Sequence, residues 1–149
     1  MTENNVNSTI SDSQETSLET VLSWIDKSSP TNRDRGTNFE NLCLIYLKNS
    51  PRWVSYFQSV KTYKDWAEDH KNSVPDGRDT GIDLVGVKHD GSFAAIQCKF
   101  FTSEARVSKR EIDSFIAASP LGENSFSERV VIATAPLGLM LKRRLMKIN

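Results

Sequence analysis

Two short apolar segments joined by a tight turn constrain this chain most strongly. The segments are Gly81–Val87 and Phe93–Lys99, and between them lies His89-Asp90-Gly91. An Asp-Gly pair between apolar runs is typical of a β-hairpin turn. We therefore predict two antiparallel strands, around which the other elements must pack.

Helical periodicity occurs on both sides of this hairpin. Apolar residues recur at helical spacing from Leu18, and a second stripe runs over residues 37–48 before Asn49-Ser50-Pro51 ends it. Between these helices, residues 28–36 are polar, and we interpret them as a break. A Ser-x-x-Glu capping box predicts a third helix over residues 108–119.

Further strands are predicted on either side of these elements. Residues 60–63 form one candidate, and residues 129–134 form a β-branched, apolar segment typical of a buried strand. The polar residues 68–80 predict a loop. This alternation of helices and strands predicts an α/β protein with a central mixed β-sheet flanked by helices.

Composition excludes several protein classes. The chain has 149 residues, which suits a single domain. No segment approaches the roughly 20 apolar residues of a membrane helix, so we expect no membrane partner. The polar N-terminus lacks the pattern of a secretory signal. Cys43 and Cys98 lie far apart in apolar segments, so we expect reduced thiols and a cytoplasmic protein.

The charges separate the two ends of the chain from its middle. The chain contains 19 basic and 19 acidic residues. Residues 1–20 contain acidic but no basic residues, and residues 139–149 contain basic but no acidic residues. A neutral middle is unusual for a protein that binds nucleic acid alone. We predict a disordered tail over residues 1–16 and a folded domain over residues 17–136.

Polar residues at the ends of the two central strands form the candidate site. Asp83 interrupts an apolar strand, whereas Gln97 and Lys99 are two residues apart and point to the same face of the returning strand. Because a hairpin brings Asp83 back toward that face, we expect a carboxylate, an amide and an ammonium group to converge at one end of the sheet.

Oxygen donors of this kind suit Mg²⁺, for which Mn²⁺ can substitute. The candidate ligands are Asp83, Gln97, the backbone carbonyl of Cys98, Glu40 from the second helix and Asp79. A metal held in this way can activate water and stabilise negative charge on a phosphate. Lys99 could orient the water or offset that charge.

Each of these residues alone also has a structural interpretation. Asp83 can cap a neighbouring backbone, Lys99 can be a surface charge, and Glu40 can be a solvated helix residue. We interpret both histidines as exposed loop residues and the three tryptophans as packing residues. The hypothesis therefore depends on the combination of Asp83 with Gln97-x-Lys99.

With these residues in place, the sequence resembles a known family. Gly81–Val85 and Ala95–Phe100 resemble the PD-(D/E)xK nuclease superfamily, in the Mrr-like restriction endonuclease branch, where glutamine often replaces glutamate. Gly36–Glu40 resembles the first core helix of that family, which contributes a glutamate. Asp79–Asp83 and Glu111–Phe115 look most like the N-terminal nuclease module of type ISP restriction–modification enzymes.

The resemblance implies a restriction-endonuclease-like core and a Mg²⁺-dependent endonuclease that hydrolyses DNA phosphodiester bonds. It implies that Asp83 is the central metal ligand, that Gln97 occupies the second acidic position and that Lys99 is the catalytic lysine. Glu40 would be the helix glutamate, and Asp79 matches a further family aspartate. Because an amide oxygen is neutral, Gln97 should bind metal more weakly than a glutamate.

The implied partners are DNA and, in an intact enzyme, helicase and methyltransferase domains. Cleavage of a duplex needs two active sites, so the resemblance also implies a transient dimer. The alternative is a catalytically inactive remnant that binds DNA or a partner. Another nuclease of the same fold, such as a Holliday-junction resolvase or a methylation-dependent type IV enzyme, is a third possibility.

The resemblance ends near the C-terminus. The modules it resembles continue into a helix with the residues Asn-Ala-Glu-Glu-Ala-Leu and then a helicase, whereas residues 140–146 read Met-Leu-Lys-Arg-Arg-Leu-Met. A one-base shift in a gene that encodes such a helix yields Met-Leu-Lys-Arg-Arg. We hypothesise that residues 137–149, a basic tail, are a frameshifted remnant; a native basic helix is the alternative.

Overall fold

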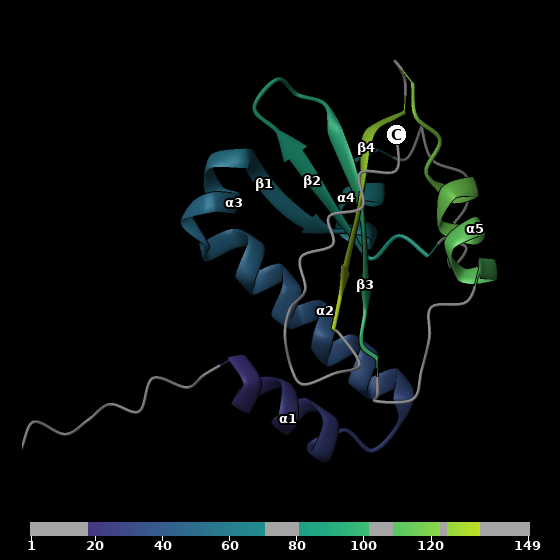
Figure 1. The fold of residues 1–149 in the computed structure, drawn as a ribbon. Coiled ribbons are helices and arrows are strands. Elements are labelled where there is room, and N and C mark those ends of the chain that lie inside the picture. Colours follow the sequence, from purple (N-terminus) through teal and green to yellow (C-terminus); the bar gives the residue numbers. More distant parts are fainter. Residues whose placement is uncertain (1–17, 71–80, 102–108, 123–124, 135–149) are drawn as a thin grey trace, which may run out of the picture.

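A mixed four-stranded sheet forms the middle layer of the molecule (Figure 1). The computed structural model describes residues 18–70, 81–101, 109–122 and 125–134. The elements are, in order, α1 (Leu18–Ser28), α2 (Asn32–Asn49), α3 (Pro51–Tyr56), β1 (Phe57–Thr62), α4 (Tyr63–Asp69), β2 (Leu84–Lys88), β3 (Phe93–Lys99), α5 (Lys109–Ala118) and β4 (Phe126–Ala133). The strand order is β1-β2-β3-β4; the β1–β2 and β2–β3 pairs are antiparallel, and β3–β4 is parallel. The predicted α/β class with a central mixed sheet is confirmed.

Two clusters of buried side chains, one on each face, hold the sheet between its helices. The first cluster joins α1, α2 and α3 to the sheet, and the second joins α4 and α5 to it. Side chains along a strand alternate between faces. Ala94, Ile96 and Cys98 belong to the first cluster and Ala95 to the second. Gln97 therefore shares the face of Ala95, on the side of α5 in Figure 1.

The observed helices differ from the sequence prediction at residues 28–36. α2 begins at Asn32, five residues before the predicted start at Thr37, so the polar segment is only partly a break. The Thr31 side chain accepts a hydrogen bond from the Asp34 N–H at 3.1 Å and caps the first turn. Capping and tertiary contacts thus outweigh the poor helix propensity of Gly36.

The sequence pattern does not predict two short helices, α3 and α4, that the structure contains. Pro51 ends α2 as expected, but it also occupies the first turn of α3, where its fixed φ is suitable. Thr62 caps α4 by accepting a hydrogen bond from the Asp65 N–H at 3.2 Å. Each helix buries a tryptophan, Trp53 in α3 and Trp66 in α4, and these contacts offset the cost of so short a helix.

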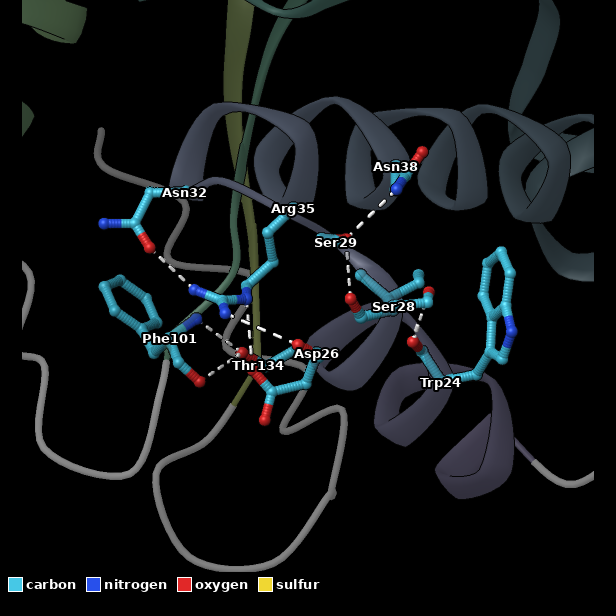
Figure 2. A network of polar contacts seen from close by, with 10 residues as sticks. Trp24, Asp26, Ser28, Ser29, Asn32, Arg35, Asn38, Phe101 and Thr134 are labelled. Carbon is cyan, nitrogen blue, oxygen red and sulfur yellow. Dashed lines mark hydrogen bonds and ion pairs between the residues drawn. The ribbon is translucent and has the colours of Figure 1, made fainter.

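The junction between α1 and α2 is closed by Arg35 (Figure 2). Its Nε lies 3.0 Å from a carboxylate oxygen of Asp26, and a terminal nitrogen donates to the side-chain oxygen of Asn32 at 2.7 Å. Nearby, Asn38 donates to the hydroxyl of Ser29 at 3.1 Å. These contacts fix α1 against the start of α2, the helix that carries Glu40.

A glycine in β2, Gly86, leaves space for an aromatic ring. A Cβ at Gly86 would lie 2.4 Å from the Phe57 ring, which is itself buried and stacked on Trp53. We expect Gly86→Ala to destabilise the fold by about 1–3 kcal/mol through overpacking. Gly36→Ala is the matched control, because nothing lies within 4 Å of its Cβ position. It should stabilise α2 by about 0.5–1 kcal/mol. Urea denaturation measures both changes. Equal midpoints for the two variants would contradict the close packing of Gly86 against the Phe57 ring.

Several sequence predictions fall outside the described residues. These include the tails at residues 1–16 and 137–149, most of the loop at residues 68–80, and Ser108 of the capping box. Within the ranges that the structure describes, no helix is both long enough and apolar enough to cross a membrane.

Candidate functional site

Asp83 is fixed at the point where β2 and β3 separate. Its backbone N–H donates to the Ile96 carbonyl, and its own carbonyl accepts from the Tyr63 N–H, each at 2.9 Å. Its Oδ2 accepts a hydrogen bond from the Cys98 N–H at 2.6 Å. The carboxylate thus accepts the hydrogen bond that a backbone carbonyl of a neighbouring strand would otherwise accept from β3. This charge-assisted bond orients the carboxylate. The capping role considered for Asp83 is therefore present in the structure.

A pocket of about 250 Å³ opens beside Asp83. Its lining comes from α2, from the β1–α4 junction and from the start of β2, and consists of Glu40, Asn41, Thr62, Tyr63, Lys64, Ile82, Asp83 and Leu84. Glu40 reaches the pocket because Phe39 and Cys43 occupy the buried stripe of α2 and leave Glu40 half-buried at its edge. The structure therefore brings Glu40 and Asp83 together.

Gln97 is on the neighbouring strand and does not line this pocket. Its side chain is buried, and its Oε1 has no hydrogen-bond partner among the described residues. Gly81 lies next to it and has a φ of +72°, a backbone conformation that favours glycine; a Cβ there would be in ordinary contact with the Gln97 Nε2, at 3.4 Å. An unsatisfied buried polar atom costs about 1–3 kcal/mol, so an acceptor that no described residue satisfies is a candidate to bind a ligand.

Lys99 ends β3 on the same strand face as Gln97. It is half-buried, and its backbone carbonyl accepts a hydrogen bond from the Thr134 N–H at 3.1 Å. Cys98, whose N–H binds the carboxylate of Asp83, lies between Gln97 and Lys99. The link between Asp83 and the segment Gln97–Lys99 is thus the backbone N–H of Cys98, which lies between them. Glu40, in contrast, lines the same pocket as Asp83.

The side chain of Cys98 points to the α2 face. A hydrogen bond to Cys43 raises the pKa of the Cys98 thiol, and burial and the nearby acidic groups Cys43, Asp83 and Glu40 raise it further. A protonated thiol is a poor nucleophile and a poor metal ligand. What Cys98 contributes beside Asp83 is thus its backbone N–H and not its thiol.

The donor atoms fit Mg²⁺ better than a metal that needs a closed protein shell. Across the described residues, no three His, Cys, Asp or Glu side chains form a group that could hold a metal ion. Mg²⁺ typically needs only one or two carboxylates, and water and substrate phosphates complete its shell. Asp83 and Glu40, which line one pocket, could supply these carboxylates, whereas Gln97 carries an oxygen of the same hard type outside that pocket. Asp79 lies outside the described residues.

Part of the pocket could not be anticipated from the sequence. Asn41, Tyr63 and Lys64 line it, and none of them stands out in the sequence as a site residue. The only signal is that Asn41 directly follows Glu40 on the helix. Tyr63 and Lys64 line the pocket because the Tyr63 N–H donates a hydrogen bond to the Asp83 carbonyl. This contact joins segments that are distant in sequence, so no local sequence pattern predicts it.

Comparisons with known proteins identify the family of this chain. A family model described as "Restriction endonuclease" (Mrr_cat_2) matches residues 48–142, which include Asp83, Gln97 and Lys99 and begin after Glu40. The chain is also similar to a solved structure, "ATP-dependent Type ISP restriction-modification enzyme LlaBIII bound to DNA", with 29% identity and a TM-score of 0.55. That likeness covers 80% of this chain but only 6% of that one. No curated protein sequence matches the chain.

The matched family range takes in well over half of the chain, and the mixed sheet carries Asp83 and Gln97-x-Lys99 at adjoining strand ends. The solved relative places a similar fold within a restriction–modification enzyme. On these grounds, the chain belongs to the Mrr-like restriction endonuclease family.

Proposed function

We propose that the chain is a Mg²⁺-dependent endonuclease domain that hydrolyses DNA phosphodiester bonds in the cytoplasm, with Mn²⁺ able to replace Mg²⁺. The observation that carries this proposal is the hydrogen bond from the Cys98 N–H to Asp83 Oδ2. It joins the Asp83 carboxylate to the backbone between Gln97 and Lys99. The Asp83 carboxylate therefore lies beside the segment of β3 that carries Gln97 and Lys99, which supports a shared site at this end of the sheet.

Each residue has a proposed role. Asp83 and Glu40 would hold the metal, with Gln97 Oε1 and the Cys98 carbonyl as further oxygen donors and Asp79 as an additional candidate. When bound, Mg²⁺ supplies an activated water and neutralises charge on the phosphate. Lys99 orients the attacking water and offsets the negative charge that develops on the phosphate. The bond from the Cys98 N–H orients the Asp83 carboxylate, and backbone bonds to Tyr63 and Ile96 hold the residue that carries it, which reduces reorganisation during the reaction.

The neutral charge of the chain supports a role within a larger enzyme. The chain has formal net charge +0, and much DNA affinity normally comes from basic groups. We therefore propose that this domain works within a larger enzyme whose helicase and methyltransferase domains supply most of the DNA affinity. The similar solved enzyme is ATP-dependent and bound to DNA, and this chain spans only 6% of its length. Two such domains, meeting transiently, would cut both strands.

A nicking assay tests the nuclease proposal. Supercoiled plasmid is incubated with the 149-residue chain and Mg²⁺, Mn²⁺ or EDTA, and circular dichroism verifies that the protein is folded. We expect open-circular DNA with either metal and none with EDTA. A folded chain that nicks under no metal condition would contradict an active domain and favour the inactive remnant, in which the same fold only binds DNA or a partner.

The unused oxygen of Gln97 gives a test that does not need activity. Gln97→Met removes a buried unsatisfied acceptor, so without metal it should stabilise the fold by about 1 kcal/mol or more. If Gln97 Oε1 is a metal donor, the same variant should lose part of the rise in melting temperature that Mg²⁺ causes. Thermal denaturation with Mg²⁺ and with EDTA measures both effects. Gln58→Met, at an exposed position of β1, is the control. An undiminished Mg²⁺ response in Gln97→Met would remove Gln97 from the metal site.

A further inference from the structure

We propose that Lys64 is a substrate-positioning residue that binds a DNA phosphate at the mouth of the Asp83 pocket. The inference rests on the proposed nuclease function and extends it to a residue outside the motif by which the family is recognised. Of the described residues that line this pocket, Glu40 and Asp83 are anionic and Lys64 is the cation. A phosphate that approaches two carboxylates is repelled unless positive charge compensates.

Hydrogen bonds on either side of Lys64 fix the position of its main chain. The Tyr63 N–H bonds the Asp83 carbonyl at 2.9 Å, so the residue before Lys64 is tied directly to Asp83. The Thr62 hydroxyl accepts from the Asp65 N–H at 3.2 Å and holds the turn that contains Lys64. The flexible four-carbon stem of a lysine can then carry its ammonium group across the pocket mouth.

The ammonium group of Lys64 is available for a phosphate. Its side chain is exposed, and no ion pair joins it to another residue in the described part of the chain, not even to Glu68 one turn later on α4. Lys61, three residues earlier in β1, differs from Lys64 in that it forms an ion pair. Its Nζ lies 2.8 Å from Asp69 Oδ2, and it does not line the pocket.

The experiment compares how salt affects DNA binding by Lys64 and Lys61 variants. The full chain binds a fluorescently labelled duplex in Ca²⁺, which occupies oxygen sites, and anisotropy is recorded from about 50 mM to about 200 mM NaCl. Loss of one phosphate contact reduces the magnitude of the slope of log affinity against log salt by about 0.9. Between the lowest and the highest salt concentration, the affinity of Lys64→Gln should therefore fall by a factor about 3.5-fold smaller than that of the parent. Lys64→Arg should retain the parental slope, and Lys61→Gln should not change it. A charge that acted only on folding would not change this slope.

Nicking kinetics with Mg²⁺ complete the test. Because the contact exists before and during the reaction, Lys64→Gln should raise KM while kcat changes little. An unchanged salt slope in Lys64→Gln, an equal reduction in Lys61→Gln, or no DNA binding by the parent chain would overturn the role of Lys64. A parent that binds DNA but never nicks it would instead contradict the proposed function, and the slope comparison would still decide whether Lys64 contacts phosphate.

Discussion

Replacing Asp83 with alanine should abolish metal-dependent nicking of plasmid DNA and remove the stabilisation of the fold by Mg²⁺. A metal ion contributes several kcal/mol to stabilising charge in a transition state, so we expect a loss of at least about 10³-fold in rate. The variant also leaves the Cys98 N–H without its carboxylate acceptor. Since hydrogen bonds to charged groups are worth about 1.5–3 kcal/mol, its melting temperature should fall as well.

Asp83→Asn separates these two effects. Its amide oxygen can still accept from the Cys98 N–H, so most of the stability should return while metal binding and nicking stay low. Glu68→Ala, at an exposed position of α4, controls for the loss of any nearby carboxylate. Nicking assays and thermal denaturation with and without Mg²⁺ measure the outcome. Nicking by Asp83→Ala at the parental rate would show that the active site has been misassigned.

Replacing Lys99 with alanine should reduce nicking by about 10²-fold or more, the effect of losing one group that stabilises charge in a transition state. Binding of Mg²⁺ should be largely retained, because no metal ligand is removed. The expected signature is therefore a lower kcat with an almost unchanged Mg²⁺-induced rise in melting temperature. Lys27→Ala, at an exposed position in the last turn of α1, controls for the loss of a positive charge. If both lysine variants nick equally well, Lys99 has no role in the reaction.

The central strands were predictable because their pattern is local. The bounds of β3, Phe93–Lys99, agree with the prediction, and the Asp90-Gly91 turn places β2 against it as expected. β2, Leu84–Lys88, begins three residues after the predicted start at Gly81, so Asp83 directly precedes the strand and does not interrupt it. The register of this hairpin then decides where Asp83 meets the backbone of β3. The position of Glu40 at the edge of the apolar stripe of α2 was likewise visible in the sequence.

Other features depend on contacts between distant segments and left no local signal. The starts of β1 and β4 lie at Phe57 and Phe126, three residues before the predicted starts in each case, because each strand begins with a buried aromatic side chain that polar residues follow. The burial of Gln97 near Gly81, which is far from it in sequence, is another such feature. Lys64 reaches the pocket through the contact between Tyr63 and Asp83. Periodicity within a segment cannot encode such contacts.

The hydrogen bond between Asp83 and the Cys98 N–H also affects how such a domain would change in evolution. Natural selection for a folded chain alone would favour Asp83, because the carboxylate satisfies a strand N–H whether or not DNA is cut. The same selection would disfavour Gln97, whose buried oxygen weakens the fold and gains nothing without a ligand. A lineage that abandoned cleavage would therefore lose the glutamine before the aspartate. On the proposed roles, relatives that retain Gln97 are expected to be those that still cut DNA.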